Sequence, residues 1–276
     1  MIFKIGLCQM SGAADAAAGV KENKQETILT AERMIREAAA VDAQIIALPE
    51  MWNCPYSNLY FREYAEPQEG ETVLIMSKLA AELKVYLIGG SIPELSDGKV
   101  YNTCFIFDRM GNIIGKHRKA HLFDIDVKDG IRFMESETLT AGDCVTVVDT
   151  EFGKVGVAIC YDVRFPELSR KMALLGAKLI VLPAAFNMTT GPAHWDVTMR
   201  ARALDNQIYF AAVSPARNME GLYQAYGNSC VITPWGDFLA KADEKETILY
   251  ADIDMAYEEE IRQQLPLLKH RRPELY

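Results

Sequence analysis

The chain has 276 residues, half of them hydrophobic, with a formal net charge of −9 and a sequence pI near 5.1. A chain of this length can bury a substantial core, and we expect one domain over residues 1–276. The acidic balance disfavours binding to the phosphate backbone of nucleic acid. No apolar stretch approaches the roughly 20 residues of a membrane-spanning helix. We therefore expect neither nucleic acid nor a membrane among the partners.

The cysteines are scattered along the chain without the close spacing of a metal-binding or redox motif. Several lie inside apolar runs that are typical of strands. Residues 1–9 alternate in polarity and stop too soon for the apolar core of a signal peptide. These features predict reduced thiols and a cytoplasmic protein. The six cysteines are Cys8, Cys54, Cys104, Cys144, Cys160 and Cys230.

Strands and helices alternate in the first part of the chain. A strand at residues 1–9 precedes a helix at residues 21–40, in which charged residues separate the apolar ones. A short apolar strand follows at residues 44–48. Pro49 ends this strand and leaves Glu50 at its C-terminal tip.

A helix at residues 72–83 and a strand at residues 85–92 come next. Residues 101–107 and 113–119 then predict a hairpin, because a turn-forming segment separates two apolar runs. The final residue of that hairpin is Lys119. A second polar side chain is therefore expected at a strand end.

Residues 121–140 show little regular pattern and several charges, which is typical of a long functional loop. Beyond this loop, strands and helices alternate again, and no linker or repeat divides the chain. Strands are predicted at residues 145–148, 154–159, 178–182, 208–213, 227–233, 238–241 and 247–253, and helices at 166–176, 193–203 and 255–264.

Cys160 lies between the strand at residues 154–159 and a helix that Pro166 and Glu167 begin. Backbone N–H groups and the positive end of the helix dipole at such a junction favour thiolate over thiol. An ordinary cysteine has a pKa of about 8.5, so efficient attack also requires a base. Many free cysteines only pack in a core, so the local pattern leaves both packing and catalysis open.

Glu50, Lys119 and Cys160 all follow predicted strands, and open α/β sheets build their sites at that edge. The residues around each form an ordered motif, and together the motifs resemble the Glu, Lys and Cys motifs of the nitrilase superfamily of carbon–nitrogen hydrolases. The resemblance covers essentially the whole chain. The motifs are Leu48-Pro49-Glu50-Met51-Trp52, Lys116-His117-Arg118-Lys119-Ala120-His121-Leu122-Phe123-Asp124 and Gly156-Val157-Ala158-Ile159-Cys160-Tyr161-Asp162-Val163-Arg164-Phe165-Pro166-Glu167-Leu168.

Residues 121–126 and 183–195 are most similar to the ω-amidase branch of that superfamily. The resemblance implies an α/β fold, a four-layer α-β-β-α sandwich of two stacked mixed sheets with helices outside, in a protein that forms a homodimer. It also implies hydrolysis of the side-chain amide of 2-oxoglutaramate or 2-oxosuccinamate to a 2-oxo dicarboxylic acid and ammonia. The expected partners are a small amide and water, with no metal and no cofactor.

The resemblance also implies a role for each polar residue. Cys160 attacks the amide carbon and forms a thioester, while Glu50 takes the thiol proton and later activates water. Lys119 and the backbone N–H of Tyr161 hold the developing oxyanion. Glu135 matches the second glutamate that family members place beside the lysine. Taken singly, Glu50 and Glu135 are more typical of surface charges, and Lys119 of a strand-end lysine that faces solvent.

Contacts to the substrate are expected from residues that follow the Cys motif and the next strand. The substrate carboxylate requires a cation, and Arg164 or Arg202 can supply it. Phe186, Asn187 and Trp195 are candidates for the pocket wall. A structural ion pair explains either arginine equally well, and core packing explains both aromatic residues.

Two histidines lie near these motifs, His121 as a loop contact and His194 in an orienting or helix-start role; a structural role explains both. A papain-like site would combine Cys160 with His194 and an asparagine, but it leaves the Glu and Lys motifs unexplained. A nitrilase, an N-carbamoyl-amino-acid hydrolase and a deaminated-glutathione amidase remain alternatives within the superfamily. A non-catalytic binding protein on this fold is a further alternative, against which the four polar residues argue.

Overall fold

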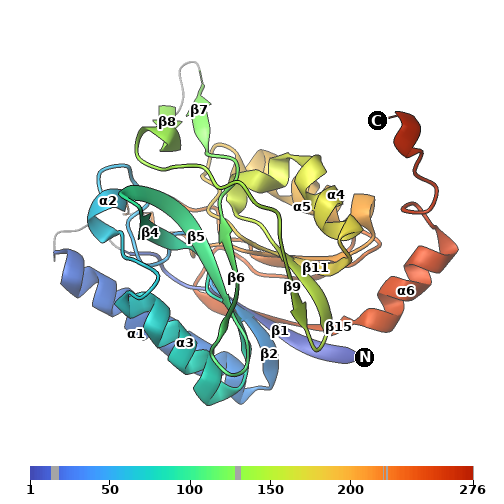
Figure 1. Ribbon diagram of the computed structural model, residues 1–276, viewed down its shortest axis with the longest axis horizontal. Helices are drawn as coiled ribbons and strands as arrows, with labels where there is room; N and C mark the ends of the chain where they lie inside the picture. Colours follow the sequence, from blue (N-terminus) through green and yellow to red (C-terminus); the bar gives the residue numbers. More distant parts are fainter. Residues whose placement is uncertain (14–18, 128–131, 220, 222, 276) are drawn as a thin grey trace.

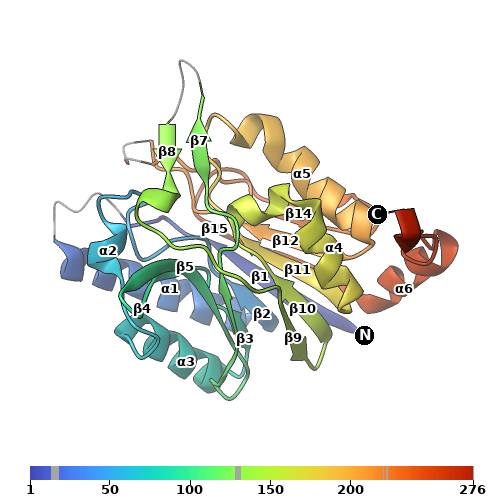
Figure 2. The ribbon, with the colours of Figure 1, turned by 45° about the horizontal axis from the view of Figure 1, so that its top comes forward.

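Two β-sheets lie face to face in the computed structural model, and helices cover their outer faces (Figures 1 and 2). The helices α1 (Val20–Ala40) and α3 (Glu71–Leu83) pack on the first sheet. The helices α4 (Pro166–Leu174) and α5 (Gly191–Asn206) pack on the second. The predicted four-layer sandwich is confirmed. The structure describes residues 1–13, 19–127, 132–219, 221 and 223–275.

The first sheet has seven strands in the order β15-β1-β2-β3-β5-β4, and β6 pairs with β5. β1, β2 and β3 run parallel and their neighbours are antiparallel, so the sheet is mixed. The predicted hairpin is the antiparallel pair β5 and β6. The bounds are β1 Ile2–Gln9, β2 Ala43–Ala47, β3 Tyr86–Ile88, β4 Ile92–Ser96, β5 Lys99–Phe107, β6 Ile113–Arg118 and β15 Thr247–Asp254.

The second sheet has six strands in the order β14-β13-β12-β11-β10-β9. β10, β11 and β12 are parallel, and the outer strands are antiparallel. The bounds are β9 Thr146–Thr150, β10 Gly153–Val157, β11 Ala177–Pro183, β12 Tyr209–Val213, β13 Cys230–Ile232 and β14 Phe238–Lys241. The final helix, α6 (Met255–Gln264), agrees with the predicted residues 255–264.

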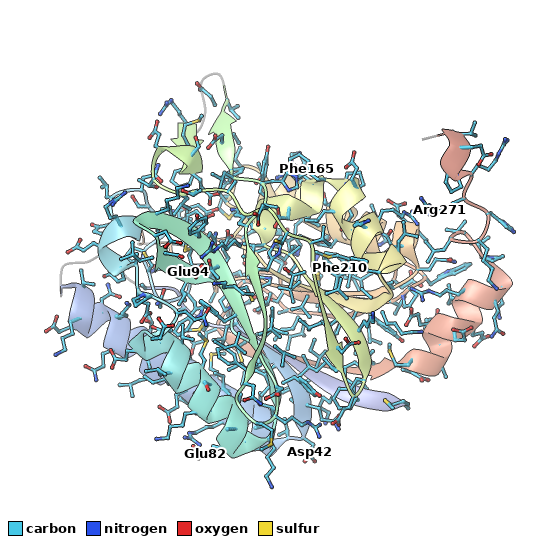
Figure 3. The ribbon with its side chains drawn as sticks, in the orientation of Figure 1. Asp42, Glu82, Glu94, Phe165, Phe210 and Arg271 are labelled. Atoms are coloured by element: carbon cyan, nitrogen blue, oxygen red, sulfur yellow. The ribbon has the colours of Figure 1, made fainter. Side chains whose placement is uncertain are left out.

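The strand period of two assigns side chains to the layers of the core. In β2, Ile45 and Ala47 join the cluster between the two sheets, while Ile46 packs with Leu48 in the cluster beneath α1 and α3. Phe210 of β12 is fully buried and lies in the interior (Figure 3). Apolar side chains on both faces of the central strands therefore hold the layers together.

Two predicted segments differ from the structure. The single strand predicted at residues 85–92 is interrupted, because the chain turns at Gly90, where φ is +63° and a Cβ would lie 2.3 Å from the Pro49 carbonyl oxygen. Only glycine fits that position without strain. The short helix α2 (Phe61–Tyr64) was not predicted.

The stretch predicted as an irregular loop at residues 121–140 is partly regular. It contains the antiparallel pair β7 (Asp124–Asp126) and β8 (Arg132–Met134), followed by a 3₁₀ turn at Glu135–Glu137. Residues 128–131 of this stretch lie outside the described residues. Within the described part of the chain, no helix is both long and apolar enough to cross a membrane.

Candidate active site

Three chain segments that leave neighbouring strand ends build the candidate site. Glu50 follows β2 and Lys119 follows β6, both in the first sheet, whereas Cys160 follows β10 in the second sheet. The site therefore lies where the two sheets meet. Strand ends fix side-chain positions well, because the ladder hydrogen bonds hold the backbone up to the last residue.

Lys119 is the centre of a buried ion cluster. Its Nζ lies 2.9 Å from Glu50 Oε1 and 2.8 Å from Glu135 Oε1, and none of these three side chains is exposed. Glu135 stands at the start of the 3₁₀ turn, where its Oε2 accepts a 2.7 Å hydrogen bond from the Phe123 amide. The structure thus brings together three of the charged residues that the sequence singles out.

Sequence reasoning missed the uncharged partners of this cluster. The Tyr56 hydroxyl donates its proton to Glu135 Oε1 at 2.6 Å and lies 3.1 Å from Glu50 Oε1. Asn102 Nδ2 donates to Glu50 Oε1 at 2.9 Å, and the Ala185 amide donates to Glu50 Oε2 at 2.8 Å. Proximity of Tyr56 to the Glu motif was the available signal, whereas nothing distinguishes Asn102 from other polar residues of a strand.

The electrostatics of the cluster follow from burial and opposite charge. Burial raises the pKa of Glu50, the Lys119 ammonium opposes that shift, and the Glu135 carboxylate adds to it. Burial alone would lower the pKa of Lys119, but Glu135 and Glu50 outweigh it, so its pKa is raised and the ammonium stays charged. The site therefore holds a fixed cation next to a carboxylate that is well suited to take a proton.

Cys160 is buried at 5 % exposure and begins a 3₁₀ turn, Cys160–Arg164, with φ of +43°. This left-handed backbone is strained for a residue with a side chain. Burial raises the pKa of Cys160 well above its ordinary value, and the nearby Glu50 carboxylate raises it further. The helix start favours thiolate, but burial and Glu50 outweigh the opposing effect of Lys119, so the pKa is raised and the thiol depends on a base.

Asp162 joins the segments that carry the cysteine and the lysine. Its Oδ2 accepts hydrogen bonds from the Ile159 amide at 3.0 Å and from His117 Nε2 at 2.9 Å. Its Oδ1 accepts from the His121 amide at 2.9 Å and from His121 Nδ1 at 2.8 Å. The Asp162 carboxylate therefore ties Ile159, the residue before Cys160, to His117 and His121, which lie two residues before and after Lys119. Asp162 belongs to the Cys motif, so its position there was the available sequence signal.

A small cavity opens beside Cys160. We call it the nucleophile-side pocket; its volume is about 10 Å³. The Arg164 guanidinium lies 4.8 Å from the Phe186 ring centroid, and its Nη1 is 3.0 Å from His194 Nδ1. The pocket is lined by Cys160, Tyr161, Arg164, Phe186, Asn187 and Tyr223, among others.

Asn187 offers a hydrogen-bond donor in the nucleophile-side pocket. Its Oδ1 accepts from the amides of Thr189 and Thr190 at 3.1 and 2.9 Å, which fixes the side chain. Its Nδ2 is buried and has no partner among the described residues. A buried unpaired donor is costly, so a ligand that accepts from it is expected.

Two predicted pocket residues lie elsewhere. Arg202 directs its Nε to the Val163 carbonyl oxygen at 2.7 Å and so supports the turn after Cys160. Trp195 is fully buried, packs edge-on against Phe186 and donates to the Asn228 carbonyl oxygen at 2.9 Å. Neither lines the nucleophile-side pocket in the described part of the chain.

A buried cysteine, two glutamates and a lysine between stacked sheets define a hydrolase of carbon–nitrogen bonds. The model of the family described as carbon-nitrogen hydrolase matches residues 4–263, and the chain belongs to this family. It is 54% identical to omega-amidase NIT2-A of Xenopus laevis and 47% identical to human omega-amidase NIT2, over 99% of this chain and 96% of each relative.

A solved structure agrees with these relatives. Nit3 of Saccharomyces cerevisiae, described as a member of branch 10 of the nitrilase superfamily, is 43% identical with a TM-score of 0.89, over 98% of this chain and 97% of that chain. The recognition of the superfamily from three motifs is confirmed, and the relatives agree with the branch.

Proposed function

We propose that this chain is an ω-amidase that hydrolyses the side-chain amide of a small 2-oxo acid amide, such as 2-oxoglutaramate or 2-oxosuccinamate. The relatives named omega-amidases support the substrate class. The observation that carries the chemistry is the fully buried Lys119 ammonium, held between Glu50 and Glu135 at the strand end facing Cys160.

In the first half-reaction, Glu50 accepts the thiol proton as Cys160 attacks the amide carbon. The Glu50 carboxylate lies close enough to the thiol for each group to shift the pKa of the other, and we assign the proton's path to this approach. The carbon–nitrogen bond then breaks, and the proton passes from Glu50 to the leaving nitrogen, which departs as ammonia. The products are a thioester on Cys160 and an ionised Glu50, ready for the second half-reaction.

The tetrahedral intermediate carries negative charge on the former amide oxygen. The Lys119 ammonium and the backbone N–H of Tyr161 stabilise that charge, and loss of one such donor typically costs about 3–4 kcal/mol of barrier. Glu135 and Tyr56 hold the ammonium in place through their 2.8 and 3.4 Å contacts to Nζ. Because these contacts exist before substrate binds, little reorganisation accompanies the reaction.

In the second half-reaction, Glu50 takes a proton from water, and the oxygen attacks the thioester carbon. The carbon–sulfur bond breaks, the thiolate recovers its proton from Glu50, and the dicarboxylic acid leaves. Arg164 anchors the carboxylate that the substrate carries from the start, and Asn187 Nδ2 donates to the same carboxylate or to the 2-oxo group. Both side chains line the nucleophile-side pocket.

Assembly and location belong to the same proposal. Val197 and Leu204 lie seven residues apart on α5 and are 63% and 42% exposed, and the 48% exposed Trp235 precedes Gly236, which lies beside Leu204. We assign this apolar face to a homodimer contact. The six free cysteines support a reducing, cytoplasmic location for the single carbon–nitrogen hydrolase domain.

Hydrolysis of a panel of compounds tests the proposal, with ammonia as the measured product for all of them except deaminated glutathione, which releases cysteinylglycine. 2-Oxosuccinamate and 2-oxoglutaramate should be turned over, whereas a nitrile, an N-carbamoyl amino acid and deaminated glutathione should react far more slowly. Cys160→Ala is the inactive control. Preferred turnover of any of the latter three compounds would replace the assigned substrate while preserving the family chemistry. Absence of hydrolysis with all five would favour a binding protein.

A further inference from the structure

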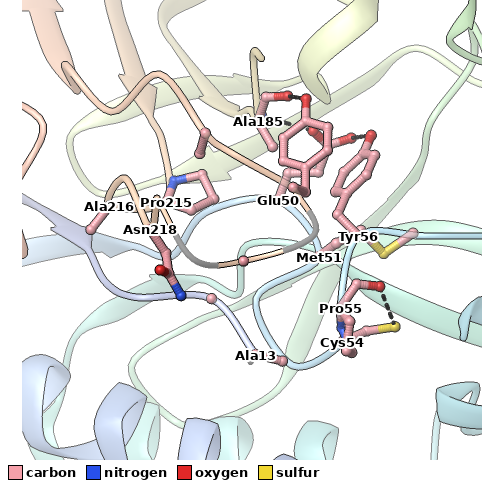
Figure 4. A pocket seen from close by; sticks show the side chains of 14 residues that line it. Ala13, Glu50, Met51, Cys54, Pro55, Tyr56, Ala185, Pro215, Ala216 and Asn218 are labelled. Atoms are coloured by element: carbon pink, nitrogen blue, oxygen red, sulfur yellow. Dashed lines mark hydrogen bonds between the residues drawn. The ribbon is translucent and has the colours of Figure 1, made fainter. Parts of the chain in front are cut away.

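The proposed nucleophile and the proposed base open to two different cavities. Cys160 lines the nucleophile-side pocket, whereas Glu50 lines a second cavity of about 50 Å³, which we call the base-side pocket. Figure 4 shows Glu50 and Tyr56 on one side of this second cavity, with Ala216 and Asn218 across from Tyr56. The base-side pocket is lined by Glu50, Cys54, Tyr56, Ala216, Asn218 and Tyr223, among others.

Two residues form the partition between the cavities. Ala185 and Tyr223 line both of them, and the Tyr223 hydroxyl donates a hydrogen bond to the Ala185 carbonyl oxygen. The Ala185 amide donates to Glu50 at 2.8 Å, and the Tyr56 ring packs 4.5 Å from the Tyr223 ring centroid. Hydrogen bonds and ring packing therefore hold the partition next to the carboxylate that must exchange protons.

The linings of the two cavities differ in charge. Arg164 lines the nucleophile-side pocket, whereas the described residues of the base-side pocket include the Glu50 carboxylate and no lysine or arginine. A substrate carboxylate in the base-side pocket would meet the Glu50 carboxylate, and the nearby Lys119 ammonium is already shared by Glu50 and Glu135. A water molecule needs about 10–15 Å³ of cavity. The base-side pocket thus has room for a few small neutral molecules next to Glu50.

We propose that the base-side pocket supplies the hydrolytic water and receives the ammonia, while the acyl group stays in the nucleophile-side pocket. This inference rests on the proposed function, since it assigns a route to the two small molecules of that reaction. Ammonia takes its proton from Glu50 and leaves on the Glu50 side. Water then enters from the same side, gives a proton to Glu50, and its oxygen displaces sulfur from the thioester carbon.

Filling the base-side pocket tests this route. Ala216 is buried, lines the cavity and lies outside the proposed catalytic and binding machinery, so Ala216→Leu should reduce the space for water. We expect the first-turnover burst of ammonia to persist after acid quench, while kcat falls and the Cys160 thioester becomes the major form in intact-protein mass spectra. Ala216→Ser adds one polar atom and is the matched control, which should resemble wild type.

A larger nucleophile sharpens the test. Hydroxylamine has one heavy atom more than water, so its yield of hydroxamate relative to hydrolysis should fall in Ala216→Leu. Cys54→Met fills the same cavity from another wall and should also lower kcat and accumulate the thioester. This second variant keeps the test available if Ala216→Leu does not fold.

A raised KM for the amide with no accumulated thioester in these variants would assign the base-side pocket to the acyl group and overturn the inference. A folded variant with unchanged kcat and an unchanged ratio of hydroxamate to hydrolysis product would overturn it as well. Failure of the proposed function differs from both outcomes, because wild type itself would then release no ammonia.

Discussion

Two buried carboxylates, Glu50 and Asp162, belong to the surroundings of Cys160, and their pKa values move in opposite directions. Burial raises the pKa of Glu50, and Lys119 only partly offsets it. Burial would also raise the pKa of Asp162, but hydrogen bonds from His117 and His121 outweigh it, so that its pKa is lowered. The difference lies in the partners of each carboxylate rather than in its depth.

The donors explain this difference. Asp162 accepts from two backbone amides and two histidine rings, so its charge is stabilised by direct hydrogen bonds and its position is fixed. Glu50 shares Lys119 with Glu135, a second buried carboxylate that disfavours its ionised form. We conclude that Asp162 suits a holding role, whereas Glu50 suits proton transfer.

Replacement of Glu50 should have the largest effect on catalysis. Glu50→Gln keeps the size and can accept from Lys119, but it cannot take the thiol proton, so kcat should fall by about 10²–10⁴-fold. Ammonia release from 2-oxosuccinamate measures this loss. His194→Gln is the informative partner variant, because a papain-like site would lose its base there; retention of kcat in Glu50→Gln together with loss in His194→Gln would contradict the proposed base.

Replacement of Asp162 should have a smaller effect of a different kind. Asp162→Asn removes the negative charge that accepts four hydrogen bonds. The new side-chain NH2 group is itself a donor, so it faces donor groups on one side and those hydrogen bonds are lost. A shift of about 1 Å in Cys160 or Lys119 can cost about 10²-fold in rate, so kcat should fall toward that value with little change in KM. Steady-state kinetics beside the exposed control Asp149→Asn measure it. A wild-type kcat in Asp162→Asn would contradict the proposal that Asp162 holds Cys160 and Lys119 in position.

The two carboxylates should also differ in how they link stability to pH. The folded-state pKa of Asp162 is below its unfolded value of about 3.9, so its contribution is present above that pH and is lost as the pH falls below it. Urea titrations between neutral pH and acid should therefore show a shallower acid loss of unfolding free energy in Asp162→Asn than in wild type. Parallel curves would contradict a lowered pKa for Asp162.

Periodicity predicted the strands and helices because it extends over whole elements, as in β1, α1 and β11, whereas the four layers were implied by the resemblance to the nitrilase superfamily. Strand ends also marked Glu50, Lys119 and Cys160. Nothing in that periodicity reports a contact between distant residues. The approach of Tyr56 to Glu135 at 2.6 Å and the partition at Tyr223 depend on how separate loops pack.

The protonation of Cys160 shows a second limit of sequence reasoning. A strand-to-helix junction predicts a lowered thiol pKa, whereas burial beside Glu50 raises it. The local pattern contains the helix start but not the neighbouring carboxylate, which comes from the other sheet. Electrostatics of a site built from both sheets can be predicted only after the sheets are stacked.

A third buried carboxylate tests whether a raised pKa by itself marks function. Glu258 of α6 has no exposed side-chain surface, and burial raises its pKa to about 7 although Arg262 and Lys178 oppose the shift. Since the unfolded value is lower, the folded state is favoured when Glu258 is protonated, and this advantage is lost as the pH rises toward 7. The ionised Glu258 thus lowers the free energy of unfolding at neutral and higher pH, and this residue is distant in the chain from the three motifs.

Glu258→Gln should therefore stabilise the protein at pH 8, since it keeps the shape and removes the ionisable group. The increase in Tm should shrink as the pH falls from about 8 toward 5, where the wild-type carboxyl is protonated in the folded state. Turnover should remain that of wild type, in contrast to Glu50→Gln. A loss of activity with unchanged Tm would instead make Glu258 a functional carboxylate like Glu50, and a raised pKa would then mark function in both.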